Sequence, residues 1–552
     1  MAKRWKYGAA ALSTIGVTAM MLVGTSGVAS AAGSKPYEGG SVTLDFTQDI
    51  AHLDPAVAYD TQSNEIVAQL YDQLVTWQQG GGEKVVPMAA KSWTVSKNGL
   101  VYTFNLRRGM TFWNGDPVTA QSFIDEIDRV MTPSVNSPGS GFYTIIQGAS
   151  AFMAGKAKTI TGLAAPNPYT LRITLNKPEA FFLETLTLPF ISAVDQKFIN
   201  SVGNKVFDSQ KAMGSGPFEL SSINQNQIVL TKNANYWRTD SYGQKLPYLN
   251  KITININTNS QLDALHFLQG QTAWIGWNFG GDGIPSSNYI QIVHDRALQQ
   301  DLLHFTEASV QYVGLNTTVG PTKNPLVRQA IEYAINKQRI VQLNNGRGII
   351  ANQPLPPMIP GYVKNMPKDA SYSYNPAKAR ALLKKAGYTN GFTVDFYSEN
   401  SPDQLKFDNE IQANLAAVGI KANIKASSWG TFLNVAMAGK APIDWLGWFQ
   451  DFPDASDFLN TLFNSNQIPA NNNQNYNNPL VDKWLNKAQT DNNQAQRVAI
   501  YKKTSIQIMK DAVWVPVYYD QATFAKQSWV HGFYSPSVGQ DPLEWIWVSP
   551  GH

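Results

Sequence analysis

The sequence predicts an α/β protein of two or three lobes, on the basis of its length, its short alternating strands and its well-marked helix ends. The chain has 552 residues, more than one ordinary hydrophobic core accommodates. Apolar and polar residues alternate in several short runs, as they do in half-buried strands. These runs predict strands at 41–46, 101–106, 171–175, 228–231 and 252–256.

Helical stripes of apolar residues accompany these strands. In the first half they predict helices over 64–75 and after Thr119, a candidate N-cap. In the second half, Asn324-Pro325 and Asn375-Pro376 each place a capping Asn before a proline at the first helical position. Signals for helices and strands thus occur in both halves, which favours an α/β architecture throughout.

The composition excludes several classes of function. The formal net charge of +4 is small for this length, so we expect no nucleic-acid partner. No cysteine is present, which excludes disulfides, thiolate metal sites and a cysteine nucleophile. The same absence excludes a lipid-modified N-terminal cysteine, a common tether of exported bacterial proteins.

Residues 1–31 have the pattern of a cleavable signal peptide. Lys3, Arg4 and Lys6 form a basic start, residues 9–23 are mostly apolar, and Ala29-Ser30-Ala31 fits the small-residue cleavage rule. A membrane anchor is the alternative, but the apolar run is short and ends at the cleavable patch. We therefore expect export of a soluble mature protein, to a periplasm or to the outer cell surface.

Motifs of catalysis are not found. The six histidines are scattered, and none has a metal-ligand spacing. A nucleophile elbow, a phosphate-binding loop and a dinucleotide fingerprint are also missing. Gly280-Gly281-Asp282-Gly283 lacks the ligands of a calcium loop and is interpreted as a plain turn. We expect no enzyme activity, no cofactor and no metal, although a carboxylate pair formed by distant residues stays open.

Tryptophans in stretches that contain Gly, Asn and Ser are the positive feature. Trp277, Trp429, Trp445 and Trp448 do not lie on obvious amphipathic stripes. For any one of them, core packing is the simpler interpretation, because most Trp side chains are largely buried. The segment 444–454 differs, since it combines aromatic residues with acidic groups and turn formers. There we expect a cleft, in which a ligand cation compensates a buried carboxylate.

An ordered series of motifs extends from about residue 42 to the C-terminus. It comprises AAKSW at 89–93, YTFNLRRG at 102–109, WNGDPVTA at 113–120, GSGPF at 214–218, YW at 236–237, VRQA at 327–330, the segments 379–388 and 451–463, and VPVYY at 515–519. With this series the sequence resembles the dipeptide/oligopeptide/nickel class of ABC-importer substrate-binding proteins, solute-binding protein family 5. It is most similar to the oligopeptide-binding members of that class.

The resemblance implies a two-lobed periplasmic-binding-protein fold (type II, cluster C) with an extra domain inserted in the first lobe. Lobe I would comprise 41–80, 195–306 and 521–552, the inserted domain 81–194, and lobe II 307–520. Crossovers near Thr306 and Asp520 would serve as hinges between the lobes.

The resemblance also implies binding residues, but no catalytic or metal-binding ones. Trp448-Phe449-Gln450-Asp451-Phe452 matches the segment in which oligopeptide receptors hold the peptide α-ammonium group, with Asp451 as its partner. Trp429 matches a pocket-wall Trp. Trp277-Asn278 matches a polar pocket stretch, and Tyr59-Asp60 matches a first-lobe loop that faces the cleft. Where these receptors offer Arg and His near the ligand C-terminus, this chain has Ala436 and Met437.

The expected function is therefore that of an extracytoplasmic substrate-binding subunit of an ABC importer. It would capture oligopeptides between two closing lobes and deliver them, as a monomer, to a membrane-embedded ABC permease with its ATPase subunits. A receptor of the same fold for another small solute, an oligosaccharide or a nickel chelate, is the alternative. An enzyme or surface protein that uses the fold for another purpose is the third possibility.

Overall fold

The structure is a computed structural model that describes residues 35–79, 82–276, 283–491, 493–534 and 540–552. The predicted signal peptide and the predicted site residues Trp277 and Asn278 lie outside the described residues. By its internal contacts, the chain from Pro36 to His552 forms one unit. Over the described residues, no helix is both long and apolar enough to span a bilayer.

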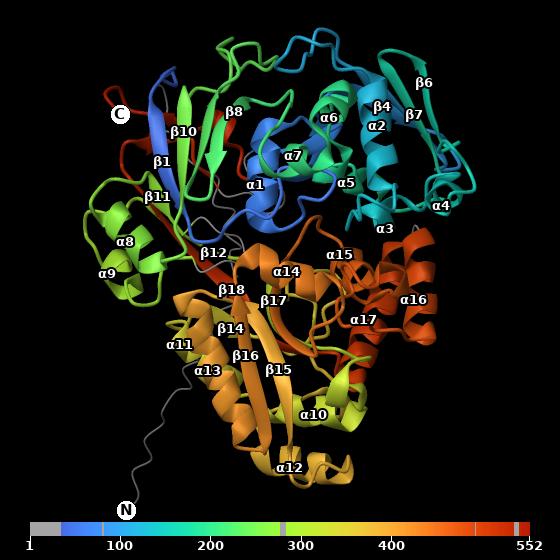
Figure 1. The fold of residues 1–552 in the computed structure, drawn as a ribbon, viewed down its shortest axis with the longest axis vertical. Helices are drawn as coiled ribbons and strands as arrows, with labels where there is room; N and C mark the ends of the chain where they lie inside the picture. Colours follow the sequence, from blue (N-terminus) through green and yellow to red (C-terminus); the bar gives the residue numbers. More distant parts are fainter. Residues whose placement is uncertain (1–34, 80–81, 277–282, 492, 535–539) are drawn as a thin grey trace, which may run out of the picture. The chain divides into compact units, whose positions relative to one another are not determined.

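A four-stranded sheet contains the first strand of the protein, β1 (Ser41–Phe46). β1 runs parallel to β10 (Lys251–Ile256), which pairs antiparallel with β9 (Gln227–Lys232), and β8 (Phe218–Asn224) forms the edge. These strands are side by side in Figure 1. Their inward residues pack with α1 (Thr61–Leu70) in one hydrophobic core. The strands predicted at 41–46, 228–231 and 252–256 are confirmed.

A second four-stranded sheet is antiparallel throughout, in the order β4 (Ala90–Val95), β5 (Val101–Leu106), β7 (Thr170–Thr174) and β6 (Leu163–Asn167). Helix α2 (Ala120–Val130) packs on β6 and β7. The hairpin of β2 (Val75–Gln78) and β3 (Gly82–Pro87) precedes this sheet in the chain. Its four strands fall within 81–194, the range predicted for the inserted domain, whose boundaries stay a prediction.

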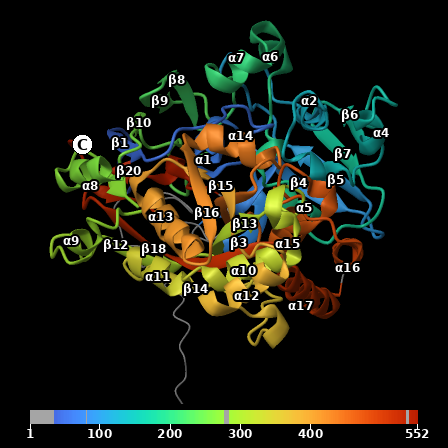
Figure 2. The ribbon, with the colours of Figure 1, turned by 60° about the horizontal axis from the view of Figure 1, so that its bottom comes forward.

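The largest sheet has the order β11 (Trp274–Ile275), β18 (Trp514–Lys526), β13 (Ser309–Leu315), β17 (Ile443–Phe449), β15 (Phe392–Glu399) and β16 (Ile420–Ser427). β12 (Leu302–Thr306) and β14 (Gly348–Ile350) also pair with β18. Helix α13 (Pro402–Ala416) lies over β15 and β16, as Figure 2 shows. The helices predicted after Asn324 and Asn375 are confirmed as α10 (Pro325–Ala334) and α12 (Pro376–Lys385), and each Asn side chain accepts a cap hydrogen bond.

Strand β18 connects two parts of this sheet. Its first half pairs with β13 and its second half pairs with β12 and β11. Between β12 and β13, the amide of Glu307 donates to the carbonyl of Asp520 at 3.0 Å. The two predicted crossovers near Thr306 and Asp520 therefore lie side by side.

The remaining helices and strands are short or flank these sheets. They are α3 (Ser140–Tyr143), α4 (Ala149–Met153), α5 (Phe182–Thr185), α6 (Gln196–Val202), α7 (Asn204–Ser209), α8 (Ser260–Leu268), α9 (Tyr289–Val293), α11 (Lys337–Leu343), α14 (Trp429–Met437), α15 (Ala455–Phe463), α16 (Pro479–Thr490), α17 (Gln494–Asp511), β19 (Val530–His531) and β20 (Trp547–Val548). Among the described residues, five single turns of 3₁₀-helix complete the set: Pro189–Ile191, Gly320–Lys323, Lys368–Ala370, Ser465–Gln467 and Leu543–Trp545.

The helix predicted over 64–75 is wrong at its C-terminal end. Helix α1 ends at Leu70, and Tyr71 is extended. Its apolar residues pack in the core of the first sheet, whereas Leu74 and Val75 belong to the core of the second. The apparent single stripe thus joined residues from two hydrophobic cores.

Several buried carboxyl groups make the folded state bind protons more tightly than the unfolded chain does. Burial raises the pKa to about 8 for Glu126 and to about 7 for Glu179, Glu332, Asp408 and Asp444. A raised pKa in the folded state contributes stability below that pKa and loses it as the pH rises through it. We expect the ligand-free protein to melt at a higher temperature at pH 5 than at pH 8, measured by calorimetry at constant ionic strength. A melting temperature that peaks at pH 8 would contradict this.

Candidate functional site

A pocket of about 1020 Å³ contains most of the predicted binding residues. One wall is the start of α1 with the preceding Tyr59 and Asp60, and the other comes from β17, α14 and the loop after β17. We call it the Asp451 pocket. The predicted residues that line it are Tyr59, Asp60, Trp429, Trp448, Phe449 and Asp451.

Asp451 is held by contacts from both walls of this pocket. Its Oδ2 accepts a hydrogen bond from the hydroxyl of Tyr59, and its amide donates to Oδ2 of Asp457 at 2.9 Å. The Tyr59 ring meets the Trp448 indole edge-on, with centroids 5.6 Å apart. The indole of Trp448 in turn donates to Oδ2 of Asp457 at 3.2 Å. The carboxyl group of Asp451 is half-buried and faces the pocket.

The electrostatics of this carboxyl group follow from its surroundings. Burial raises the pKa of Asp451 to about 7, although the hydrogen bond from Tyr59 favours its charged form. Burial also raises the pKa of Asp457 well above its usual range, and the neighbouring charge of Asp451 adds to this effect. Burial therefore favours a proton on this pair of neighbouring carboxyl groups, and a cation in contact with Asp451 would displace it.

A second contact across the Asp451 pocket joins Trp429 to Asp60. The indole nitrogen of Trp429, at the start of α14, donates to Oδ1 of Asp60 at 3.1 Å. The same Oδ1 caps α1 by accepting from the amide of Ser63 at 3.1 Å. Trp429 thus ties the first turn of α14 to the first turn of α1.

We expect Trp429→Phe to weaken ligand binding by about five- to tenfold, because it deletes one net hydrogen bond between the two walls of the pocket. Isothermal titration calorimetry with the ligand that the purified protein retains would measure the change in affinity. Trp484→Phe is the matched control, since Trp484 packs on the core of α15–α17 and lines none of the cleft pockets. Equal affinities of both variants and the native protein would show that the contact across the pocket contributes nothing to binding.

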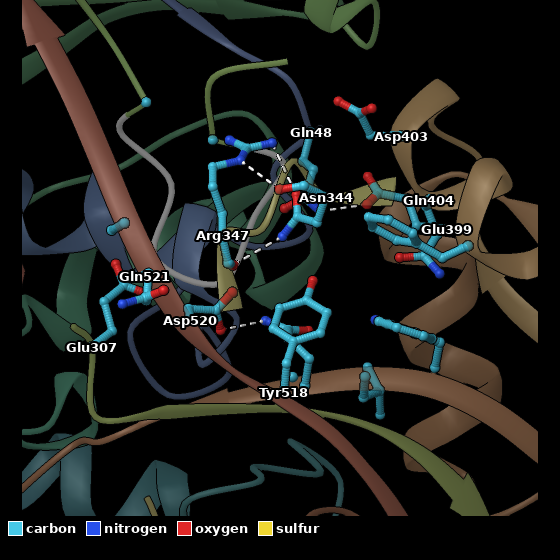
Figure 3. Close-up of a pocket in the computed structure, with 18 of the residues that line it drawn as sticks. Gln48, Glu307, Asn344, Arg347, Glu399, Asp403, Gln404, Tyr518, Asp520 and Gln521 are labelled. Carbon is cyan, nitrogen blue, oxygen red and sulfur yellow. Dashed lines mark hydrogen bonds between the residues drawn. The ribbon is translucent and has the colours of Figure 1, made fainter. Parts of the chain in front are cut away.

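A second pocket, of about 860 Å³, continues from the first. The two share Gln48, Trp429, Leu446 and Gly447 in their linings. We call it the acidic pocket, because Glu307, Glu399, Asp403 and Asp520 line it together with Arg347. Figure 3 shows these side chains and Gln48 converging on it from several segments. Gln48 donates to Oε2 of Glu399, a hydrogen bond between residues 351 positions apart.

A third pocket adjoins the Asp451 pocket, and the predicted residue Gln450 belongs to its lining. The two share Asn64, Phe449, Asp451 and Gln540. Predicted residue Gln450 lines this third pocket only. Gly276 and Gly283, the described residues that flank Trp277 and Asn278, line the acidic pocket.

Ala436 and Met437 have different surroundings in the structure. Met437 lines the Asp451 pocket. Ala436, the residue before it on α14, is fully buried in a hydrophobic core. Of the two residues expected near the ligand C-terminus, only Met437 therefore faces the cleft.

Sequence reasoning missed Gln48, Glu307, Arg347, Glu399 and the pocket role of Asp520. Glu399 is the last residue of β15, and the next parallel strand, β16, ends two residues before Trp429. Ligand sites in α/β sheets lie at the carboxyl ends of parallel strands, so this pair of strand ends was the available signal. Within the described ranges, no three His, Asp or Glu side chains are grouped to hold a metal ion.

Adjoining pockets lined by aromatic, amide and carboxyl groups are typical of a protein that binds a small solute. Comparison with known proteins shows to which family of solute-binding proteins the chain belongs. Residues 84–470 match the family model described as "Bacterial extracellular solute-binding proteins, family 5 Middle", and the chain belongs to this family. It is the substrate-binding component of an ABC importer and not an enzyme.

Curated relatives and solved structures extend the match over the length of the chain. Heme-binding protein A of Haemophilus influenzae is 27% identical over 496 residues, covering 87% of each chain. The glutathione-binding protein GsiB of Salmonella typhimurium is 28% identical over 499 residues, covering 88% of this chain and 90% of the relative. The periplasmic binding protein DppA of Helicobacter pylori, solved with the peptide STSA, has a TM-score of 0.80 at 28% identity and covers 93% of this chain and 98% of its own.

The murein tripeptide binding protein MppA of Escherichia coli shares the fold. Its TM-score is 0.83 at 22% identity, over 93% of this chain and 99% of its own. The two-lobed α/β fold is therefore confirmed.

Proposed function

We propose that this substrate-binding component captures oligopeptides and holds their α-ammonium group at Asp451. The observation that carries the proposal is a half-buried carboxylate facing a large pocket, with no ion pair to a Lys, Arg or His of the described residues. A carboxylate withdrawn from water is stabilised by a cation in hydrogen-bonding contact. The terminal ammonium of a peptide supplies that cation with three N–H donors.

The rest of the lining suits a peptide main chain. Each peptide group offers one donor and one acceptor, and amide side chains provide both. The amide side chains that line the Asp451 pocket are Gln48, Gln62, Asn64, Asn471, Asn473 and Gln540. Such partners would bind the backbone of a peptide whatever its side chains are.

The charge of the cleft favours a peptide over the ligands named for the two curated relatives. Glutathione carries two carboxylates and one ammonium group, and haem carries two propionates. The acidic pocket already holds four carboxyl side chains. A ligand with two carboxylates would meet these acidic groups and only one basic lining residue among the described ones, Arg347, which disfavours it relative to a peptide of zero or positive net charge.

An oligosaccharide is the second candidate, favoured by the half-buried indoles of Trp429 and Trp448 in the pocket wall. Sugar rings would stack on such faces without the help of a charge at Asp451.

Binding measurements separate these candidates. Native mass spectrometry of the purified protein would identify retained cargo, and calorimetry would compare a tetrapeptide, glutathione, haem and an oligosaccharide. We expect a peptide mass and a Kd for the tetrapeptide of about 1 µM, or roughly 8 kcal/mol. Binding of the oligosaccharide or haem without any peptide affinity would contradict the proposal.

We further propose that the protein is exported and acts as a monomer, whose closed form delivers its ligand to a permease with ATPase subunits. A ligand shifts the population toward closure only if it binds the closed form more tightly. Fractionation of cells and light scattering of the purified protein test these two points. Recovery in the cytosol, or a dimer at micromolar concentration, would contradict them.

A further inference from the structure

The acidic pocket is lined by more carboxyl than basic side chains. Of its four carboxyl groups, Asp403 forms an ion pair with Lys406. Arg347 is the cation that lines the pocket among the described residues. Among the described residues, four carboxyl groups and one basic group therefore line the pocket.

Arg347 is directed mainly at neutral acceptors. Its Nη1 donates to the carbonyl of Ile284 at 2.5 Å, and its Nη2 donates to Oδ1 of Asn344 at 2.9 Å. Its Nε donates to the carbonyl of Asn344 at 3.2 Å, and Figure 3 shows it turned toward that residue. The charge of Arg347 also acts on Asp520, whose charged form it favours.

The side chain of Glu307 is a second, independent indication that a ligand binds in the acidic pocket. Its side chain is only 4% exposed and lines the acidic pocket. Its Oε1 is buried without a hydrogen-bond partner. Asp520 lies nearby, where its Oδ2 accepts from Oγ of Ser309 at 2.7 Å and from Nε2 of Gln311 at 3.1 Å. A buried acid left unsatisfied is costly, so such groups mark places where a ligand completes the set.

Aromatic rings complete the lining. Phe407, Trp429, Trp445 and Tyr518 border the same pocket. The rings of Phe407 and Trp445 are stacked with centroids 5.6 Å apart, and Tyr518 lies 6.3 Å from Trp445. The faces of aromatic rings attract cations, and carboxyl groups beside them add charge-assisted hydrogen bonds.

We infer that the acidic pocket is a subsite for a basic side chain of the bound peptide, a Lys or an Arg, recognised by Glu307 and Asp520. The inference rests on the proposed peptide function. Because the acidic pocket and the Asp451 pocket share Gln48, Trp429 and Leu446, one peptide reaches both. This chain would therefore select basic peptides. Asp451 would hold the α-ammonium group of the peptide, and Glu307 and Asp520 would hold its basic side chain.

Proton linkage supports the same assignment. Burial raises the pKa of Glu307 well above its usual range, and the nearby charges of Asp520 and Asp541 add to the rise. Burial also raises the pKa of Asp520, against the opposing effect of Arg347. A cation that contacts Glu307 and Asp520 favours their charged forms, so binding of a basic side chain should release protons to the buffer.

The test uses pentapeptides of alanine in which one Lys is moved along the chain, each matched by a peptide with the uncharged isostere norleucine. At one position we expect Lys to bind at least tenfold more tightly than norleucine, by calorimetry in two buffers of different ionisation enthalpy. The double variant Glu307→Gln/Asp520→Asn should reduce this preference to within twofold and abolish the extra proton release of the Lys peptide over its norleucine match. Asp444→Asn, the matched loss of a buried acid outside the cleft pockets, should leave the preference intact.

Three outcomes would overturn the inference. If Lys and norleucine peptides bind equally at every position, the subsite is wrong while the peptide function stands. If no peptide binds, both fail. If Glu307→Gln weakens Lys and norleucine peptides alike and lowers the melting temperature, Glu307 has only a structural role. We expect the opposite, an unchanged or higher melting temperature, because Gln removes an unsatisfied buried acid.

Discussion

Replacing Asp451 by Asn is expected to weaken the binding of peptides with a free N-terminus by about ten- to a hundredfold. The variant keeps the shape of the side chain and one acceptor oxygen but removes the charge. A hydrogen bond to a charged group contributes about 1.5–3 kcal/mol, and about 1.4 kcal/mol corresponds to tenfold in affinity. The hydroxyl of Tyr59 would lose a charged acceptor at the same time.

A double-mutant cycle isolates the ammonium contact from this second effect. Native protein and Asp451→Asn are each titrated with a peptide and with its N-acetylated form. If Asp451 holds the ammonium group, the variant loses affinity for the free peptide but not for the acetylated one. Because Asp451 has a pKa of about 7, the affinity of native protein for the free peptide should also fall as the pH drops from 8 to 5. Equal losses for both peptides would remove Asp451 from the binding site.

Replacing Arg129 by Leu is expected to destabilise the protein by about 3–5 kcal/mol, the largest loss of stability that the structure predicts for a single ion-pair group. Arg129 on α2 is 7% exposed, and its Nη1 donates to Oδ1 of Asp54 at 2.9 Å and to Oε2 of Glu126 at 2.7 Å. Asp54 and Glu126 are themselves 3% and 0% exposed. Leu would leave two buried carboxyl groups without their cation.

Chemical denaturation of ligand-free protein measures this loss. Lys197→Leu is the control, because Lys197 forms an exposed pair with Asp116 at 3.5 Å. An exposed pair contributes little, so this variant should change the free energy of unfolding by less than about 1 kcal/mol. Equal small changes for the two variants would show that the buried triad of Asp54, Glu126 and Arg129 does not stabilise the fold.

How far the fold could be predicted depended on how each strand is buried. Half-buried strands such as β1 and β5 alternate between apolar and polar residues and were predicted with correct bounds. All residues of β13 are buried, and β17 is buried along most of its length. A strand buried on both faces does not alternate, so neither could be recognised by period. The segment 444–454 was therefore interpreted as lining a cleft, without recognition of the strand β17 that its first residues form.

The residues of the candidate site also differ in how far the sequence could predict them. Asp451, Trp448 and Phe449 are close in sequence, so a local motif could indicate them together. The acidic pocket is formed by Gln48, Glu307, Arg347, Glu399 and Asp520, which come from five distant segments. Each of these residues is unremarkable among its sequence neighbours, and only the folded chain brings them together. Apart from the strand end that Glu399 marks, the sequence therefore held no signal for this pocket.

A crystal structure of the protein with a bound peptide would show directly whether Asp451 holds the ammonium group. We expect the α-ammonium nitrogen to lie about 2.8 Å from a carboxylate oxygen of Asp451, the usual length of a charge-assisted hydrogen bond. A ligand bound elsewhere, with that carboxylate in contact only with Tyr59 and water, would contradict it.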